Sequence, residues 1–322
     1  MSDIITMGEP MTMFVADEEG QLDSVTHYTR FLAGAEVNVS IGLSRLGYTV
    51  GYVTRVGSDP FGTYIKHALE QDCIETSYVA VDTAHPTGFQ LKSRVSVGDP
   101  EVVYFRKGSA ASHLSTEDVQ KVDLSATRHI HVTGIPLALS DSCLAAVDAL
   151  VDRGREHHIP ITFDPNLRPS LWRDQATMVE TVNRIAAKCD YVLPGMEEAV
   201  ITTGYAKPFE AAEFYLRLGA KAVIVKMGAQ GAFVHTGTES YMVPGFTVPK
   251  VIDTVGAGDG FAVGVISGLL DGISLRDAVK RGNAIGSIQV MTRGDNDDLP
   301  TRAQLVSFLN GHLEAKGGGA GQ

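Results

Sequence analysis

Cysteine is scarce in this chain, and no cysteine-based site is indicated. Three cysteines, Cys73, Cys143 and Cys189, are spread over 322 residues. They form no CxxC pair and no Cys/His cluster with zinc spacing, which argues against a disulfide framework and a zinc site. We therefore expect three buried, reduced thiols.

Clusters of positive charge are also lacking. Lysine and arginine total 27 against 38 aspartates and glutamates, which gives a net charge of −11. No basic run of the kind that follows a phosphate backbone occurs, so nucleic acid is not an expected partner. Phosphorylated small molecules are not excluded, because local backbone donors and a few cations bind them.

Long apolar runs are absent as well. No uninterrupted apolar segment approaches the roughly 20 residues that a membrane helix needs. The chain enters an apolar strand-like segment at residue 4 without the basic start and long apolar stretch of a signal peptide. We therefore expect no membrane partner and a cytoplasmic address. With 44% hydrophobic residues, the chain can bury a large core.

Short β-branched runs alternate with helix-length segments from the middle of the chain onward. The runs expected as strands are residues 129–133, 159–163, 191–193 and 222–226. Residues 141–157 and 209–218 have the apolar spacing of helices with one buried face. This alternation predicts an α/β fold, with a mostly parallel central sheet and helices on both faces.

The first third of the chain does not follow this alternation. Residues 10–17 and 87–106 are extended and β-rich, and Gly98-Asp99-Pro100 is a turn signal. We interpret them as a small β-sheet lid over a site, with extra edge strands of the main sheet as the alternative. The prediction is one α/β domain over residues 1–316, with lid strands from about 10–31 and 86–108, and a flexible tail at 317–322.

The strongest motif is DTVGAGDGF at residues 253–261, which precedes an apolar helix. The amides of Gly256, Ala257 and Gly258 would lie at a helix N-terminus, where the dipole favours an anion such as a phosphoryl group. Asp259 in the same turn could take the proton of an attacking hydroxyl. The alternative is a glycine-rich turn whose aspartate only caps the helix.

The whole nine-residue string closely resembles the second signature of the ribokinase-like, or PfkB, sugar kinases. That resemblance implies a ribokinase-like fold, with Asp259 as catalytic base and residues 256–258 as the anion hole. The segments AGAEVN at 33–38 and VGSDPFG at 56–62 are similar to the first signature of the family. By this resemblance, Gly34 and Asn38 are expected to contact sugar hydroxyls.

A nucleotide site is also implied by the resemblance. KMGAQG at 226–231 is similar to the KxGxxG turn of the family, which makes Lys226, Gly228 and Gly231 candidates for ATP contact beside Gly256 and Gly258. Asn283 falls on the helix that flanks the adenine in relatives, so it is a further candidate.

A divalent cation, Mg²⁺, is expected with ATP, because it neutralises charge between the phosphates. Many relatives carry an Asn-x-x-Glu motif whose glutamate organises Mg²⁺ through water. This chain has Gly195 at the asparagine position and keeps the glutamate as Glu198. Glu198 is thus the candidate for a water-mediated metal contact, although a glutamate opening a helix also suits the helix dipole. A need for a monovalent cation is left open.

Four further segments are similar to 2-keto-3-deoxygluconate kinases. They are GEPMTMF at 8–14, YFRKGSAAS at 104–112, DPNLRPSLW at 164–172 and GDNDDLPT at 294–301. A sugar acid needs a cation for its carboxylate, and the planar guanidinium of arginine suits one.

Arg106 and Arg168 are the candidates for that cation, and structural ion pairing is the alternative for each. Arg168 is also a candidate for neutralising the transferred phosphate. The resemblance implies that Tyr104, Phe89 and Gly34 form the walls of the substrate pocket. Phe89 replaces a tyrosine of some relatives, which removes a hydroxyl donor.

Taken together, the sequence predicts an ATP-dependent kinase that phosphorylates a primary hydroxyl of a sugar acid, with 2-keto-3-deoxygluconate as the expected substrate. A fructokinase or ribokinase-like enzyme for a neutral sugar is the alternative. A sugar-responsive binding protein without turnover is a third reading. Because relatives pair their lids across a two-fold axis, a homodimer or larger homo-oligomer through the lid is expected.

Overall fold

The computed structural model describes residues 1–95, 100–291, 296 and 298–317. Nine strands of this described part form the main sheet, whose neighbouring strands are, in order, β13 (Ser240–Pro244), β12 (Gly231–His235), β11 (Ala222–Lys226), β10 (Tyr191–Val192), β9 (Ile161–Asp164), β8 (His129–Thr133), β1 (Ile4–Met7), β4 (Val50–Gly57) and β5 (Val79–Asp82). From β5 to β11 all neighbours are parallel, and β12 and β13 add an antiparallel edge.

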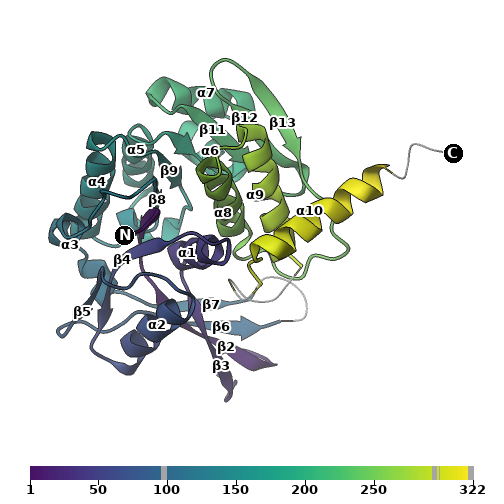
Figure 1. The fold of residues 1–322 in the computed structure, drawn as a ribbon. Coiled ribbons are helices and arrows are strands. Elements are labelled where there is room, and N and C mark those ends of the chain that lie inside the picture. Colours follow the sequence, from purple (N-terminus) through teal and green to yellow (C-terminus); the bar gives the residue numbers. More distant parts are fainter. Residues whose placement is uncertain (96–99, 292–295, 297, 318–322) are drawn as a thin grey trace.

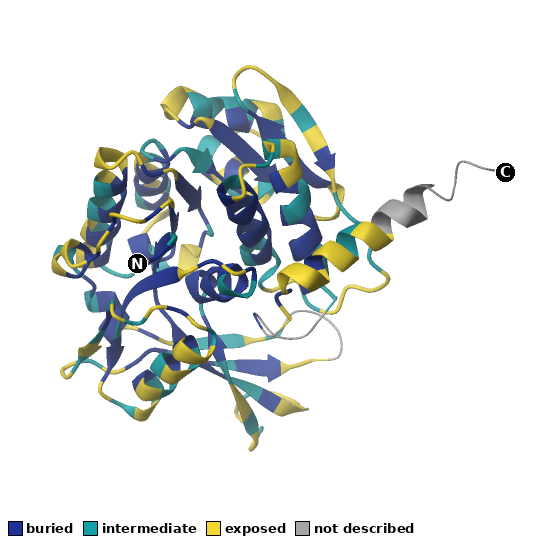
Figure 2. Ribbon diagram, viewed as in Figure 1, coloured by how far each residue is buried: buried dark blue, intermediate teal, exposed yellow. Residues whose placement is uncertain are grey.

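Helices cover both faces of this sheet (Figure 1). One face packs on α1 (Ala35–Arg45), α2 (Pro60–Gln71), α8 (Ala257–Leu270), α9 (Leu275–Gln289) and α10 (Arg302–Gly317). The other face packs on α3 (Thr116–Gln120), α4 (Asp141–Glu156), α5 (Gln175–Ala186), α6 (Met196–Thr203) and α7 (Pro208–Leu218). Ile4 belongs to the first core and Ile5 to the second, because successive side chains of a strand point to opposite faces. The central strands are therefore buried on both sides (Figure 2).

The predicted α/β class with a mostly parallel sheet is confirmed. Two expected strands, 129–133 and 222–226, coincide with β8 and β11. The strand expected at 159–163 begins two residues later, at Ile161. Pro160, which precedes it, has no N–H to donate to a sheet ladder. The expected helices at 141–157 and 209–218 correspond to α4 and α7.

A second, separate sheet projects from the main body (Figure 1). Its strands, in spatial order, are β3 (Tyr28–Ala33), β2 (Met11–Glu19), β6 (Phe89–Arg94) and β7 (Val102–Phe105). They pair with one another and not with the main sheet, which overturns the alternative of extra edge strands. Of the expected turn at 98–100, Gly98 and Asp99 lie outside the described residues. We call this four-stranded sheet the lid.

Two smaller expectations concern the cysteines and the C-terminus. Cys143 and Cys189 are buried and free as expected, whereas Cys73, free as well, is exposed, which corrects the prediction for that residue. Gly317 is the last residue of α10, and the rest of the expected tail lies outside the described residues. Across the described ranges, no helix combines the length and apolar character that crossing a membrane requires.

Candidate active site

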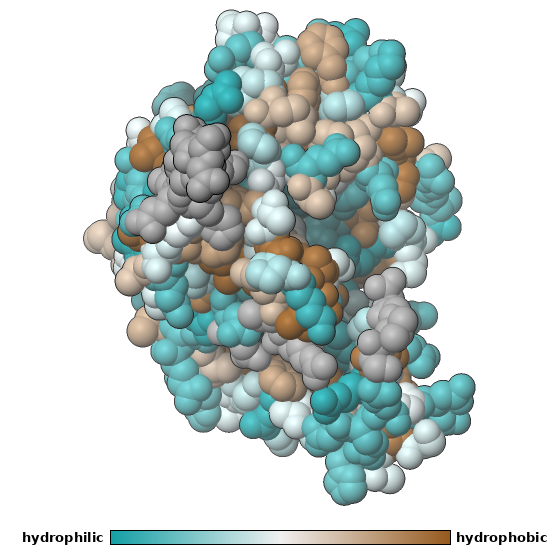
Figure 3. All heavy atoms as spheres, turned by 90° about the vertical axis from the view of Figure 1, so that its right-hand side faces the viewer, coloured by the Kyte–Doolittle hydropathy of each residue, from teal (hydrophilic) through white to brown (hydrophobic). Residues whose placement is uncertain are grey.

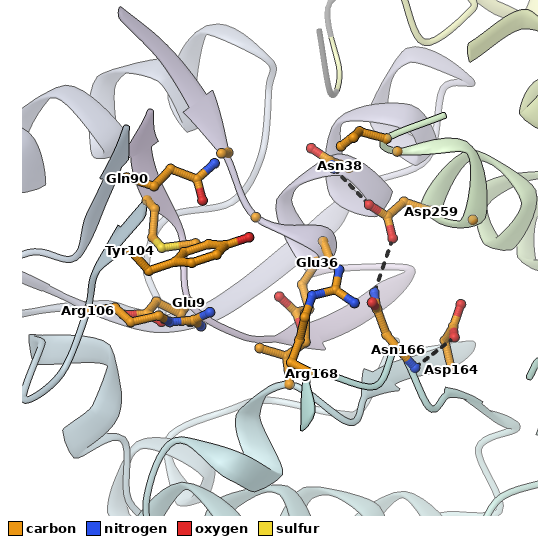
Figure 4. Close-up of a pocket in the computed structure, with 18 of the residues that line it drawn as sticks. Glu9, Glu36, Asn38, Gln90, Tyr104, Arg106, Asp164, Asn166, Arg168 and Asp259 are labelled. Carbon is orange, nitrogen blue, oxygen red and sulfur yellow. Dashed lines mark hydrogen bonds and ion pairs between the residues drawn. The ribbon is translucent and has the colours of Figure 1, made fainter. Parts of the chain in front are cut away.

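A cavity of about 350 Å³ lies between the lid and the main body. From the lid and the loops at its ends, it is lined by Glu9, Met11, Ala33, Gly34, Gln90, Tyr104 and Arg106. From the main body, it is lined by Ala35, Glu36, Asn38, Ile135, Asp164, Asn166, Arg168, Glu198, Lys226, Thr254, Val255, Gly256, Gly258 and Asp259. Sequence segments more than 200 residues apart therefore meet around one space, where the lid residues face Arg168 and Asp259 (Figure 4).

The glycine-rich loop at 253–258 runs directly into α8. Gly256 is the N-cap of this helix and has a φ of 77°, which favours glycine. Amides in the first turn of a helix have no acceptor within the helix, and they lie at the positive end of its dipole. Since Gly256 and Gly258 line the cavity, this turn can bind an anion there.

Asp259 follows in the same turn, and two asparagines hold its carboxyl group (Figure 4). Asn38 Nδ2 donates to Oδ2 over 2.8 Å, and Asn166 Nδ2 lies 3.5 Å from Oδ1. Asn296 Nδ2 in turn donates to Asn38 Oδ1 over 3.0 Å, which orients the Asn38 amide. The N-cap of α8 is Gly256, and the described hydrogen bonds of the Asp259 carboxyl group go to the two asparagines, so the capping alternative is not what the structure shows.

The surroundings of Asp259 also change its acidity. Burial raises its pKa from 3.8 to about 7, and the nearby carboxylates of Asp164 and Glu36 act in the same direction. The bond from Asn38 and the charge of Lys226 oppose this shift. A carboxyl group with a pKa close to neutrality is suited to accept a proton from an alcohol.

Lys226, expected as a nucleotide contact, lies at the end of β11 and lines the cavity. Its Nζ donates to Asp164 Oδ2 over 2.6 Å. Burial alone would lower the pKa of Lys226, but the Asp164 and Glu198 carboxylates outweigh burial and raise it. A Cβ atom on Gly258 would lie 3.6 Å from Nζ, so a positive charge lies directly beside the anion-binding turn.

Gly231 and Asn283, two of the other expected nucleotide residues, meet at the end of β13, away from the cavity lining. Gly231 has a φ of 97°, and a Cβ there would meet the Val243 carbonyl oxygen at 2.1 Å. Asn283 on α9 donates from Nδ2 to the Val243 and Pro244 carbonyl oxygens over 3.0 and 3.1 Å. Gly228, with a φ of 56°, opens the turn between β11 and β12. The structure thus brings Gly231 and Asn283 together, and the contact of all three residues with ATP stays a prediction.

Glu198 lines the cavity, and both of its oxygens accept backbone amides. Oε1 accepts from Leu167 N and Oε2 from Gly195 N, each over 2.7 Å. Gly195 thus contributes only its backbone, as expected where the asparagine of relatives is missing. Carboxylate oxygens facing a cavity suit Mg²⁺ held through water. Within the described residues, no group of three or more His, Cys, Asp and Glu side chains could hold a metal.

The two candidate arginines are in different states. Arg106 is 9% exposed, and its Nε donates to Oε2 of the buried Glu9 over 2.6 Å, so its charge is already balanced. This is the ion pairing left open as the alternative for Arg106. Arg168 is exposed and donates from Nη1 to the Leu167 carbonyl oxygen over 2.9 Å. Among the described residues no carboxylate forms an ion pair with Arg168, so its charge is available to a ligand.

Phe89 is the expected pocket residue that the structure places elsewhere. Its ring stacks on Phe105 at 4.6 Å between centroids and also contacts Phe61 of α2, on the lid face away from the cavity. Gln90 and its strand partner Tyr104 face the cavity instead. The physical reason is the two-residue alternation of a strand, which puts neighbours on opposite faces. Gly34 lines the wall as expected.

Sequence reasoning missed several residues of the site. Glu36, 1% exposed, accepts a bond from Thr133, and burial raises its pKa to about 7. Asp164 accepts a hydrogen bond from Lys226, and Asn166 contacts Asp259. Gln90 brings a side-chain amide from the lid to the cavity wall. Glu36, Asp164 and Asn166 lie inside motif strings from which only other residues were selected. The motifs therefore contained these residues, but only the fold shows which partner each of them contacts.

The fold and the site together define a phosphotransferase of the sugar kinase type. A helix N-terminus, a charged lysine and a carboxyl group with a raised pKa converge on one covered cavity, as phosphoryl transfer to an alcohol requires. The chain belongs to the pfkB family of carbohydrate kinases, since the sequence model of that family matches residues 1–302. The expected ribokinase-like fold is confirmed by its solved relatives.

Three relatives illustrate this membership. The chain is 48% identical to a 2-dehydro-3-deoxygluconokinase of Bacillus subtilis over 309 residues, which cover 96% of this chain and 95% of the relative. A PfkB protein from Polaromonas sp. JS666 has 45% identity and a TM-score of 0.89, covering 95% of this chain and all of its own. A ribokinase II candidate from E. coli, solved with ATP and Mg²⁺, has 27% identity and a TM-score of 0.88, covering 97% and 100%.

Proposed function

We propose that this chain transfers the γ-phosphoryl group of ATP to the terminal primary hydroxyl of 2-keto-3-deoxygluconate, also called 2-dehydro-3-deoxygluconate. The product is 2-keto-3-deoxy-6-phosphogluconate. The observation that carries the proposal is the position of Asp259, which two asparagines hold in the first turn of α8 beside the cavity. The similarity to the Bacillus subtilis kinase supports the substrate.

Asp259 acts as the base in this reaction. Its carboxylate takes the proton of the sugar hydroxyl, whose oxygen forms a bond to the γ-phosphorus. The bond from that phosphorus to the bridging oxygen breaks, and ADP leaves. The amides of the α8 turn and the Lys226 ammonium stabilise the negative charge on the phosphoryl oxygens.

Mg²⁺ would supply charge neutralisation between the β- and γ-phosphates. Glu198 is the proposed residue for it, acting through water, because its carboxylate faces the cavity and two backbone amides fix its position. The ATP and Mg²⁺ bound by the E. coli relative support both requirements. Replacing K⁺ by a bulky organic cation in the same assay tests for a monovalent requirement.

The carboxylate of the sugar acid is proposed to bind Arg168. This guanidinium is exposed toward the cavity, whereas Arg106 is neutralised by Glu9 and serves the shape of the wall. Tyr104, Gln90 and Gly34 from the lid side, with Asn38 from the main body, then surround the sugar. Lid closure excludes water that would otherwise hydrolyse ATP.

A coupled ADP-release assay tests the proposal across a panel of substrates. We expect turnover with 2-keto-3-deoxygluconate at least tenfold more efficient, in kcat/KM, than with fructose or ribose. Preference for a neutral sugar would assign the chain to the fructokinase or ribokinase-like alternative. Absence of turnover with every sugar, combined with sugar binding, would indicate a binding protein.

We further propose that the protein is a homodimer or larger homo-oligomer through the lid. Phe105 on the edge strand β7 is 48% exposed on the lid face away from the cavity, and an unpaired edge with an exposed apolar side chain favours association. Light scattering after size exclusion checks this, and a monomer at all concentrations would contradict it.

A further inference from the structure

The inner face of the lid strand β6 reaches two different parts of the molecule. Gln90 lines the sugar cavity, and Lys92, two residues further on the same face, points at the loop that precedes α8. The Lys92 side chain is 8% exposed, and its Nζ lies 3.2 Å from Asp253 Oδ2. One strand thus touches both the acceptor side and the phosphate side of the site.

Asp253 is the first residue of the anion-binding loop, and its carboxylate has a second contact. Oδ1 accepts the Val255 amide over 3.0 Å, which shapes the loop just before Gly256. Its backbone is anchored beside α9, because the Asp253 amide donates to the Val290 carbonyl oxygen over 3.4 Å, as does the preceding Ile252 amide over 2.7 Å. The two oxygens of one carboxylate therefore join the lid to the turn that holds the phosphoryl group.

A second cavity, of about 640 Å³, lies between the lid and the loop beside this ion pair. Lys92 and Asp253 line it together with Met13, Phe31 and Ile252. The face of the molecule in Figure 3 shows a hollow with both hydrophilic and hydrophobic side chains around it. A largely buried ion pair next to such a space has more influence on the relative position of lid and loop than it would inside a close-packed interface.

We propose that Lys92 is a positioning residue, which sets the anion-binding loop through Asp253 when the lid covers the sugar. Lys92 touches neither substrate, and it acts by holding the loop in the geometry in which its amides face the phosphoryl group. This inference rests on the proposed kinase function. Through Lys92, phosphoryl transfer depends on the position of the lid. The same lid position brings Gln90 to the sugar.

Lys92→Met tests the idea, since it keeps most of the stem and removes the charge. We expect kcat at saturating sugar and ATP to fall about tenfold, with KM for the sugar changed less than threefold. Lys92→Arg, which keeps the cation, should restore most of kcat. The matched control is Arg94→Met, because Arg94 is a cation on the same strand face that binds the Asp17 carbonyl oxygen within the lid. It should stay within twofold of the parent chain.

Hydrogen exchange of the amides at 254–260 gives a readout that does not depend on turnover. Exchange in Lys92→Met should be at least tenfold faster than in the parent and in Arg94→Met. Unchanged kcat and exchange, or equal effects of both variants, would refute the positioning role. If Lys92→Met does not fold, Asp253→Asn gives the same comparison. Absence of sugar phosphorylation by the parent chain would refute the kinase proposal, and the exchange result would then still decide whether Lys92 orders the loop.

Discussion

Replacing Asp259 by asparagine removes the proposed proton acceptor and leaves the shape of the site nearly unchanged. The asparagine amide can turn its oxygen toward Asn38 Nδ2, which now donates to Asp259 Oδ2 over 2.8 Å. The bond that orients the side chain is therefore kept. In the described structure the hydrogen bonds of this carboxyl group go to Asn38 and Asn166, and neither the lid nor Arg168 bonds to it. Binding of the sugar should therefore change little.

The expected loss of turnover follows from the role of a general base. Such a group contributes about 10²- to 10⁴-fold to the rate, so kcat of Asp259→Asn should fall by that factor. Sugar affinity measured by calorimetry should stay within about threefold, since the substitution acts on the chemical step.

The same substitution should affect stability with a characteristic pH dependence. Burial raises the pKa of Asp259 from 3.8 to about 7, so the folded protein binds this proton more tightly than the unfolded chain. Its contribution to stability is full below about pH 4 and is lost as the pH rises through 7. The loss is at most about 4 kcal/mol, because three pH units at 1.36 kcal/mol each give that figure. Asp259→Asn lacks this titration, so it should melt higher than the parent at pH 8, and the difference should shrink toward pH 4.

A coupled ADP-release assay and thermal unfolding at pH 4, 6 and 8 measure both effects. Near-normal kcat in the folded variant would refute the assignment of the base. An unfolding difference that does not vary with pH would refute the buried carboxyl argument even if turnover were lost.

Three further predictions concern pH and the arginines. The kcat of the parent should rise about tenfold per pH unit below pH 7 and level above it, because the base must be deprotonated; a flat profile in a chemistry-limited assay would contradict the raised pKa of Asp259. Arg168→Met should lower kcat/KM for the keto acid about 10- to 100-fold and for fructose less than threefold, and equal losses would remove the carboxylate role of Arg168. Arg106→Ala should leave the buried Glu9 without its cation, destabilise the fold by about 3–5 kcal/mol and weaken all sugars alike; an unchanged melting temperature would refute this.

The sequence by itself determined the parts of this protein that depend on neighbouring residues. The alternation of β-branched runs and helical segments predicted the parallel sheet, since a strand or a helix of this kind is encoded within ten to fifteen residues. The loop at 253–258 could be recognised because its glycines, its amides and Asp259 belong to one turn. The lid was predicted because residues 10–17 and 87–106 depart from that alternation.

Only the tertiary structure decided which distant groups meet and which face a strand presents. Asn38 and Asp259 are 221 residues apart, and Arg106 finds Glu9 over 97 residues, so no local pattern encodes either pairing. Gln90, and not the expected Phe89, lines the cavity, because the register of β6 against β7 decides which side chain faces it. The charge state of Asp259 likewise depends on burial by segments from across the chain, which composition and spacing do not contain.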